Sequence, residues 1–318
     1  MCITRLRVTG DQFLLAAFLA VSSVIWLEAS LALRGTVPFP VSIVLVCFLL
    51  TACAVRLQGF RPVLLLMGLA LAIPFASEFS GVLWGIPYGR YHYGDVAGPR
   101  VLGLVPAFMY VAWLVILFAT VGTTSLAFRG ASPKLAVFDG AIATGLDVMI
   151  DPLAVRAGYW TWEDPGAFYG IPLTNFLGWF VVVAVTGIVL RLKSPQYVKG
   201  FSRAPKGVAI VFPLLLCQVA LRYAIEGAAT GFPVATAIGL FLTMPFVALA
   251  VLSLMRRGDP RALDAASRVP VRSLSGALME GEPEAVSEVP SGAARARVAP
   301  IVSRRVPARS RKPEGRRQ

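Results

Sequence analysis

The segment Phe232–Leu254, FPVATAIGLFLTMPFVALAVLSL, is apolar along its whole length and contains no charged residue. A helix needs roughly 20 mostly apolar residues to cross the hydrocarbon core of a bilayer. Seven further stretches have the same character: Phe13–Leu33, Val37–Val55, Pro62–Ser77, Val101–Val121, Leu135–Leu153, Ile171–Leu190 and Val208–Ile225. We therefore expect an all-α polytopic membrane helix bundle of about eight transmembrane helices, or of seven if one of the shortest stretches does not cross.

The composition of the 318-residue chain supports this fold class, because 57% of the residues are hydrophobic and 15% are charged. A soluble domain carries about 25% charged residues, and a mean hydropathy of +0.72 excludes disorder as the main state. From Arg256 onward the chain is rich in Arg, Pro, Ala, Ser and Glu. We expect residues 1–255 to form the membrane domain and residues 256–318 to form a disordered basic cytoplasmic tail.

The first apolar stretch also has features of a secretory signal, since Arg5 and Arg7 precede it. However, its apolar run extends to Leu33, and Trp26 and Glu28 lie where a cleavage region would be. We therefore expect an uncleaved first span.

The net charge of +13, from 30 basic and 17 acidic residues, indicates orientation in the membrane. Cytoplasmic loops of membrane proteins carry an excess of Lys and Arg. With the N-terminus inside, the basic residues of the outer loops are Arg34, Arg90, Arg100 and Arg156, and most others fall inside. We expect a multi-pass protein of the cytoplasmic (inner) membrane with both termini cytoplasmic. We also expect its tail to bind anionic lipid, and no nucleic acid.

The sequence contains none of the common metal or cofactor motifs. His92 is the single histidine, and the four cysteines show no CxxC spacing, so histidine pairs for a haem and histidine-rich di-iron boxes are excluded. No GxGxxG or GxxxxGK motif for a nucleotide occurs. We expect no metal and no cofactor, so that the chemistry would use carboxylates, aromatic rings and water.

Polar and aromatic residues gather on the side that we expect to be outer. Glu78 ends the third apolar stretch, and Asp147 and Asp151 share one face of the fifth, because they are four residues apart. The adjoining loops and the start of the sixth stretch contribute Tyr88, Tyr91, His92, Tyr93, Asp95, Trp160, Trp162, Asn175 and Trp179. An acidic side chain at membrane depth costs about 2.5–3.5 kcal/mol. So many costly groups on one side favour a functional site.

Each of these residues also has a structural explanation. Trp and Tyr form belts at bilayer interfaces in membrane proteins of any function, and Asp151, which precedes Pro152, also suits a helix end. Arg222 and Glu226 are four residues apart and suggest a structural ion pair, and Asp139 suggests a paired or snorkelling residue. The functional interpretation is favoured for the cluster as a whole.

Two segments around these residues carry recognisable motifs. The first contains Glu78–Gly81 (EFSG), Gly85–Tyr93 (GIPYGRYHY), Gly98–Pro106 (GPRVLGLVP) and Trp113. The second contains Asp147–Pro152 (DVMIDP), Gly158–Trp162 (GYWTW) and Tyr169–Trp179 (YGIPLTNFLGW). In this order the two segments resemble the signatures of the CruF-type carotenoid hydratase family. The resemblance is dense over residues 78–179, and the remaining stretches match in hydropathy alone.

The resemblance implies a cofactor-independent enzyme of carotenoid biosynthesis that adds water to the terminal C1–C2 double bond of an acyclic end group. Such end groups occur in lycopene, γ-carotene and longer bacterioruberin-type precursors, and hydration leaves a tertiary hydroxyl. The apolar carotenoid substrate would reside in the bilayer. Other carotenoid enzymes, such as a glycosyltransferase acting on the new hydroxyl, are natural partners.

Acid catalysis through a tertiary carbocation suggests a role for each marked position. Asp151 is our candidate for the acid, Asp147 for sharing or relaying its proton, and Glu78 for orienting the water. The residues that we expect to bind substrate are Tyr88, Tyr91, His92, Asp95, Trp160, Trp162, Asn175 and Trp179. Among them, Trp160 and Trp179 would form an aromatic wall that stabilises the cation.

Two other classes of function stay open. A prenyltransferase or another prenyl-lipid enzyme needs two aspartate-rich motifs to hold magnesium and diphosphate, and the spacing of Asp147 and Asp151 alone suggests one. A transporter or non-catalytic membrane scaffold for carotenoid or isoprenoid lipids needs no catalytic group. Transporters often show repeated halves, and we find no such repeat in the sequence.

Overall fold

The computed structural model describes residues 9–30, 39–129, 131–203 and 205–256. These residues form a bundle of long helices with short strands in two connecting loops, so the all-α fold class is confirmed. The helices are α1 (Gly10–Ser30), α2 (Phe39–Gln58), α3 (Phe60–Ala70), α4 (Ala76–Trp84), α5 (Ala107–Phe128), α6 (Ala136–Arg156), α7 (Leu173–Lys193), α8 (Pro195–Arg203), α9 (Lys206–Ala209), α10 (Val211–Thr230) and α11 (Pro233–Met255). Apart from Arg256, the predicted tail lies outside the described residues.

Every predicted span corresponds to a helix or to a continuous run of helices in the described ranges. Six of them are long and apolar enough to cross a membrane by length and composition: Val41–Gln58, Phe60–Trp84, Ala107–Phe128, Leu173–Lys193, Lys206–Thr230 and Pro233–Met255. The other two predicted spans correspond to α1 and α6. Helix α6 includes three aspartates, Asp139, Asp147 and Asp151.

The third span is longer than its apolar stretch suggested. Helices α3 and α4 are joined by a π-helical turn at Leu71–Phe75, which contains Pro74. Proline has no backbone N–H to donate, and a π turn is one way for a helix to continue past it. The helix therefore runs on to Trp84 and carries Glu78 in the first turn of α4.

The fourth span begins later than we predicted from Val101–Val121. Strands β2 (Arg100–Val101) and β3 (Val105–Pro106) pair antiparallel, and α5 begins at Ala107. Gly103 in the connecting turn has a φ of +73°, a conformation that glycine adopts without steric cost. The turn-forming residues, not the apolar ones, decide this boundary.

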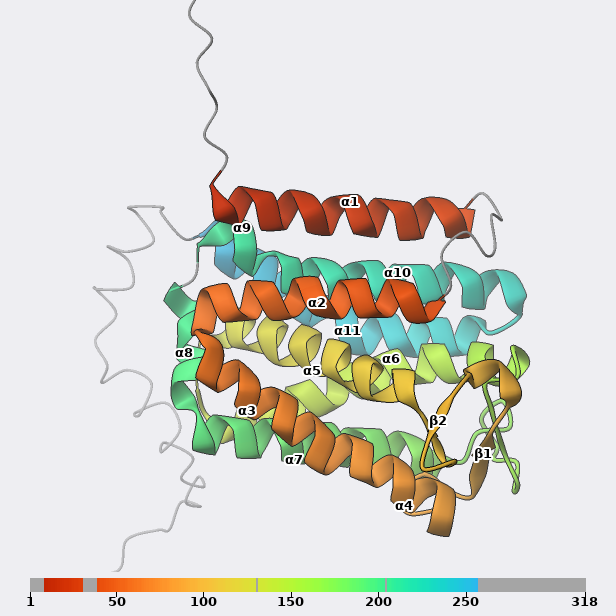
Figure 1. Ribbon diagram of the computed structural model, residues 1–318. Helices are drawn as coiled ribbons and strands as arrows, with labels where there is room; N and C mark the ends of the chain where they lie inside the picture. The colour runs from red at the N-terminus through yellow and green to blue at the C-terminus, as the bar shows by residue number, and fades with distance from the viewer. Residues whose placement is uncertain (1–8, 31–38, 130, 204, 257–318) are drawn as a thin grey trace, which may run out of the picture. The chain divides into compact units, whose positions relative to one another are not determined.

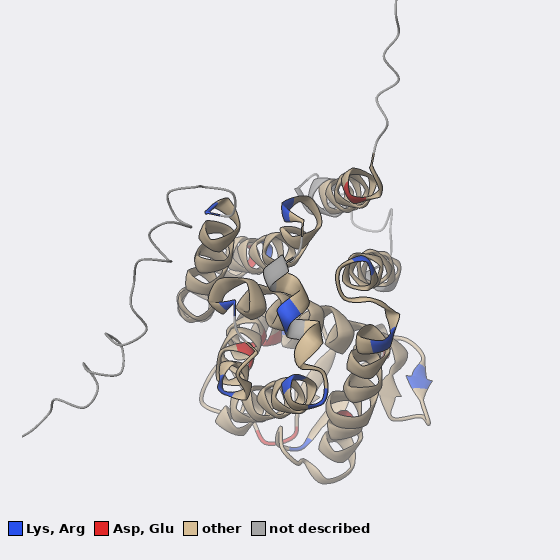
Figure 2. Ribbon diagram, turned by 90° about the vertical axis from the view of Figure 1, so that its left-hand side faces the viewer, with Lys and Arg blue, Asp and Glu red and all other residues tan. Residues whose placement is uncertain are grey.

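The two ends of the bundle differ in charge. Figure 1 shows β1 and β2 at one end of the long helices and α8 and α9 at the other. Figure 2, which views the α8 end, shows Lys and Arg at several helix ends. The described basic residues at or near the helix ends on that side include Arg56, Arg61, Arg129, Lys134, Lys193, Lys199, Lys206 and Arg256. This distribution matches the loops that the sequence assigned to the inside.

Candidate active site

Two short strands bring the two signature segments together. Strand β1 (Tyr91–Tyr93) pairs antiparallel with β4 (Trp160–Trp162), with Tyr91 opposite Trp162 and Tyr93 opposite Trp160. Because successive side chains of a strand point to opposite faces, Tyr91 and Tyr93 are buried while the intervening His92 is exposed. The loop after α4 and the loop after α6 thus form one wall of a shared site.

A small cavity of about 30 Å³ lies behind this wall. A water molecule needs roughly 10–15 Å³ of space open to its centre, so the cavity has room for water. Its lining residues come from four helices and the two strand loops: Glu78, Tyr88, Tyr91, Tyr93, Met109, Asp151, Trp160, Trp162, Asn175 and Trp179. Eight of the eleven residues that we selected from the sequence are in this set.

Glu78 lies at one side of the cavity and accepts hydrogen bonds at both carboxyl oxygens. The hydroxyls of Tyr91 and Tyr93 donate to Oε2 at 2.5 and 2.6 Å, and the indole Nε1 of Trp113 donates to Oε1 at 3.0 Å. Burying a carboxylate costs several kcal/mol, whereas each hydrogen bond to a charged group contributes about 1.5–3 kcal/mol. Three such bonds are of the size needed to offset the burial of a negative charge.

The phenol groups that hold Glu78 remain donors over a wide pH range. Burial, and then the nearby Glu78 carboxyl, raise the pKa of Tyr91 and of Tyr93 well above the ordinary value for tyrosine. Both side chains therefore keep their protons at any pH at which the protein works.

The second acidic group of the site is a carboxyl pair on α6. Asp147 and Asp151 are 1% and 2% exposed, and the amide Nδ2 of Asn175 on α7 donates to both, at 2.8 Å to Asp147 and 2.6 Å to Asp151. Asp151 also contacts Trp160 and faces the cavity, whereas Asp147 lies behind it with Oδ1 unpartnered. One amide thus fixes the positions of two carboxyl groups.

Trp113 is a site residue that we did not select from the sequence. It is fully buried on α5, donates to Glu78, and stacks on Trp179 with ring centroids 4.1 Å apart. Met109, one helical turn earlier, lines the cavity and was also missed. Trp113 belongs to the first signature segment, but its contact with a residue 35 positions away requires the packing of α5 against α4.

Close backbone approach explains two glycines of the motifs. A methyl group on Gly81 would lie 2.8 Å from ring atoms of Tyr88 and Tyr91. A methyl group on Gly178 would lie 2.8 Å from Tyr88. Larger residues at either position would displace the aromatic wall, because atoms this close overlap.

Neither His92 nor Asp95, both of which we expected to bind substrate, lines the cavity. His92 is on the outward face of β1. The Asp95 side chain is fully exposed and lies 3.5 Å from Arg100. The strand alternation in YHY and the short 3-10 helix that begins at Asp95 turn both side chains away from the cavity.

The expected Arg222–Glu226 ion pair is likewise not among the ion pairs of the described residues. Glu226 is exposed near the end of α10. A different arginine contacts this end of α10: Arg156, at the end of α6, donates to the backbone oxygen of Thr230 at 2.7 Å.

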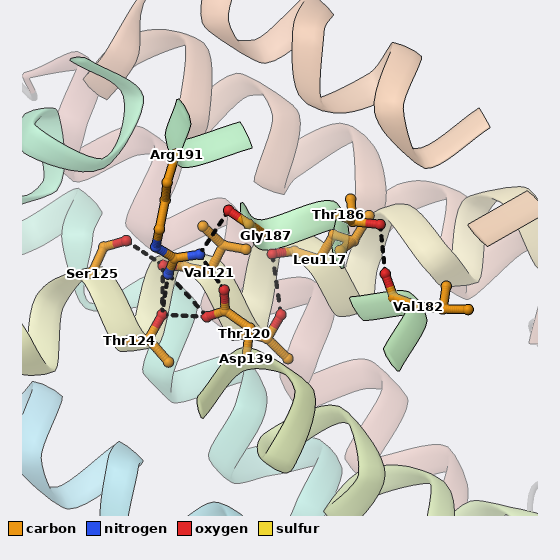
Figure 3. Close-up of polar contacts among 10 residues, drawn as sticks. All are labelled: Leu117, Thr120, Val121, Thr124, Ser125, Asp139, Val182, Thr186, Gly187 and Arg191. Atoms are coloured by element: carbon orange, nitrogen blue, oxygen red, sulfur yellow. Dashed lines mark hydrogen bonds and ion pairs between the residues drawn. The ribbon is translucent and has the colours of Figure 1, made fainter. Parts of the chain in front are cut away.

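A second buried polar cluster lies toward the opposite end of α6 (Figure 3). Arg191 forms a two-pronged ion pair with Asp139, and Thr124 donates to Asp139 at 2.5 Å and accepts from Arg191 at 3.0 Å. Gly187 leaves room for the pair, since a methyl group there would touch both charged side chains. Asp139 is therefore a paired residue, as predicted.

Within the described part of the chain, no three His, Cys, Asp or Glu side chains are grouped so as to hold a metal ion. The functional groups of the cavity are carboxyls, one amide, phenols and indoles. Such a set can donate and accept protons and stabilise positive charge.

Comparison with known proteins identifies the family. Residues 38–246 match the model of a family described as carotenoid biosynthesis protein. A bisanhydrobacterioruberin hydratase of Haloarcula japonica is 32% identical over 139 residues, which are 41% of this chain and 43% of that protein, so the match spans less than half of either. No solved structure matches. The chain therefore belongs to the carotenoid biosynthesis protein family, as the resemblance of its two signature segments to the CruF-type hydratases indicated.

Proposed function

We propose that this protein is a carotenoid hydratase that adds water to the terminal C1–C2 double bond of an acyclic end group. The observation that carries the proposal is the carboxyl pair Asp147–Asp151, bridged by Asn175 beside a water-sized cavity with aromatic walls. The similarity to a protein named bisanhydrobacterioruberin hydratase supports the same chemistry. Lycopene, γ-carotene and longer bacterioruberin-type precursors are the substrate class.

In the proposed reaction Asp151 is the general acid. Two adjacent buried carboxylates would repel each other, so the pair holds one shared proton. Asp151 gives this proton to C2, the electrons of the double bond form the new C–H bond, and a tertiary cation remains at C1. Water then attacks C1, and the proton that it loses returns to the carboxyl pair. The sum is alkene plus water to tertiary alcohol, with the acid regenerated.

The surrounding side chains suit a cationic intermediate. Trp160 and Trp179 line the cavity, and the faces of aromatic rings attract cations. Asp147 does not line the cavity but shares Asn175 with Asp151, which is the arrangement that a proton relay needs. Met109 supplies a flexible apolar side chain that can move to admit the end group, which is larger than the water-sized cavity.

Co-expression tests the proposal. We expect cells that make lycopene or γ-carotene, given this gene, to accumulate a pigment heavier by one water. The Asp151→Asn variant should make no hydrated pigment while it reaches the membrane at the normal level. The control Asp164→Asn changes an exposed acid in the loop after α6 and should match the wild type. Unchanged pigments across several acyclic substrates, with membrane expression verified, would support a scaffold or transporter instead.

We also propose that the α8 end of the bundle faces the cytoplasm, which places the site near the outer surface of the inner membrane. The concentration of Lys and Arg at that end supports this orientation (Figure 2). Cysteine substitution of exposed positions at each end, followed by labelling of intact cells with a membrane-impermeant reagent, tests it. Thr161 at the site end should be labelled, and Lys199 on α8 should be protected.

A further inference from the structure

The cavity has two acidic groups, and their partners differ in kind. The carboxyl pair on α6 is linked by one amide, which leaves Asp147 Oδ1 without a partner. Glu78, in contrast, has donors on both oxygens: Tyr91 and Tyr93 on Oε2 and Trp113 on Oε1. Each oxygen of Glu78 therefore already accepts from a protein donor, whereas the carboxyl pair keeps one oxygen, Asp147 Oδ1, without one.

The donors around Glu78 specify a negative charge. An indole N–H donates and has no acceptor atom, so Trp113 donates to Oε1 but could not accept a hydrogen bond from a proton carried there. The phenols of Tyr91 and Tyr93 keep their protons, because burial and Glu78 itself raise the pKa of both. The three donors therefore complement a carboxylate better than a carboxylic acid.

This charge has no cationic partner in the described structure. The ion pairs there are Arg56–Asp11, Arg100–Asp95 and Arg191–Asp139. Glu78 is only 4% exposed, so water screens its charge weakly. A buried carboxylate that faces a cavity and lacks a cation attracts a cation that forms inside that cavity.

We infer that Glu78 is the fixed counter-charge for the carbocation, with Trp113, Tyr91 and Tyr93 positioning its carboxylate. The inference rests on the proposed hydration and replaces the water-orienting role that we first considered for Glu78. No bond forms or breaks at Glu78 during the reaction. Its charge is in place before the alkene is protonated and stabilises the positive charge where that charge develops.

A stable mimic of the cation tests this role without turnover. The probe is an isoprenoid chain that ends in a trimethylammonium group, compared with the same chain ending in a neutral tert-butyl group. Binding is followed by quenching of tryptophan fluorescence in purified, detergent-solubilised full-length protein. We expect the wild type to bind the ammonium probe at least about tenfold more tightly than the neutral one.

Variants at the two acidic groups then separate their roles. Glu78→Gln should lose the preference for the ammonium probe while it keeps its affinity for the neutral probe, which shows that the site is still folded. Asp151→Asn should keep the preference. A Glu78→Gln protein that retains the preference would overturn the inference. Loss of the preference in the double variant Asp147→Asn, Asp151→Asn, but not in Glu78→Gln, would assign the counter-charge to the α6 pair instead.

The positioning role of Trp113 has its own readout. Trp113→Phe removes one donor to Glu78, and we expect the ratio of ammonium to neutral affinity to fall severalfold with the neutral affinity unchanged. Tyr110→Phe is the matched control, because Tyr110 is on the same helix and donates to the backbone oxygen of Met67 at 2.9 Å, away from the cavity. An unchanged ratio in Trp113→Phe would overturn this role.

Failure of this inference can be told apart from failure of the proposed function. A protein that makes hydrated pigment but shows no Glu78-dependent preference for the ammonium probe contradicts the counter-charge alone. A protein that shows the preference but makes no hydrated pigment from any acyclic substrate contradicts the hydratase proposal, and the charge assignment then stands as a cation site of another reaction.

Discussion

Helix α6 carries buried carboxyl groups in two regions, and their surroundings are opposite in character. Asp139 is bound by the guanidinium of Arg191 and by the hydroxyl of Thr124, so its charge is neutralised inside the bundle (Figure 3). Asp147 and Asp151 have an amide between them and no cation among the described ion pairs. The same residue type is therefore a structural ion in one region and, in the proposed reaction, a source of protons in the other.

The partner of a buried acid, more than its burial, therefore indicates its role. An aspartate that is paired with arginine must give up its ion pair before it exchanges a proton. The free energy lost with a buried ion pair opposes that exchange. An aspartate held by a neutral amide exchanges a proton without losing a salt bridge. Swapping or removing the partners in each region tests this distinction.

The largest effect is expected when the unpaired region loses its acid. Asp151→Asn removes the proposed general acid, and general acid–base catalysis contributes typically about 10²–10⁴-fold to a rate. We expect hydration to fall by at least about 100-fold, with no loss of thermal stability, because an amide of similar shape replaces a buried acid. Product formation and the thermal midpoint of purified protein are measured together. A stable Asp151→Asn protein with normal activity would rule out Asp151 as the acid.

The next largest effect belongs to the paired region and falls on stability. Arg191→Met leaves Asp139 buried without its cation, and breaking a buried ion pair in this way costs about 3–5 kcal/mol. We expect a lower thermal midpoint and lower membrane yield, with activity per folded molecule retained. The double variant Asp139→Leu, Arg191→Met removes both charges and should recover most of the stability. If the double variant is as unstable as the single one, the pair is not the cause.

A smaller effect is expected from the amide that links the two carboxyls of the proposed acid pair. Asn175→Leu removes two hydrogen bonds to acidic groups, each worth about 1.5–3 kcal/mol. If the free energy of one of these bonds is lost from the transition state, the rate falls by about 10- to 100-fold. Single-turnover kinetics on solubilised protein give the chemical rate. Thr144→Val, which removes a hydroxyl on α6 that bonds backbone oxygens outside the cavity, is the control. An Asn175→Leu rate equal to that of the control would show that the amide does not orient the acids.

The sequence was sufficient for the helices because hydropathy alone marks a span. It was insufficient where local turn chemistry competes with hydropathy, as at Arg100–Pro106, whose apolar residues form a hairpin and not the start of α5. It also underestimated the third span, since Pro74 is accommodated by a π turn and does not end the helix. Both differences are local, and both have their signal in glycine or proline.

The site was predictable as a set of residues and much less so as a set of contacts. Glu78, Asp151, Asn175 and Trp179 were selected because costly groups and the motifs coincide there, and all four line the cavity. The bond from Trp113 to Glu78 was not predictable, because it depends on the depth at which α5 packs against α4. The partner of Asp139 was not predictable for the same reason, since Arg191 is 52 residues away and on another helix.

The smallest effect is expected at His92 and Asp95, the two exposed residues that do not line the cavity. His92→Gln and Asp95→Asn each change an exposed side chain that does not line the cavity, so activity should change by less than about twofold, as is usual for surface substitutions within ±0.5 kcal/mol. Tyr93→Phe, one residue beyond His92, should in contrast weaken activity, because it removes a donor from Glu78. The contrast between His92 and Tyr93 is what the alternation of β1 imposes, whereas Asp95 lies beyond the strand, in the short 3-10 helix Asp95–Ala97. A large loss in His92→Gln would mean that the strand presents its other face to the substrate.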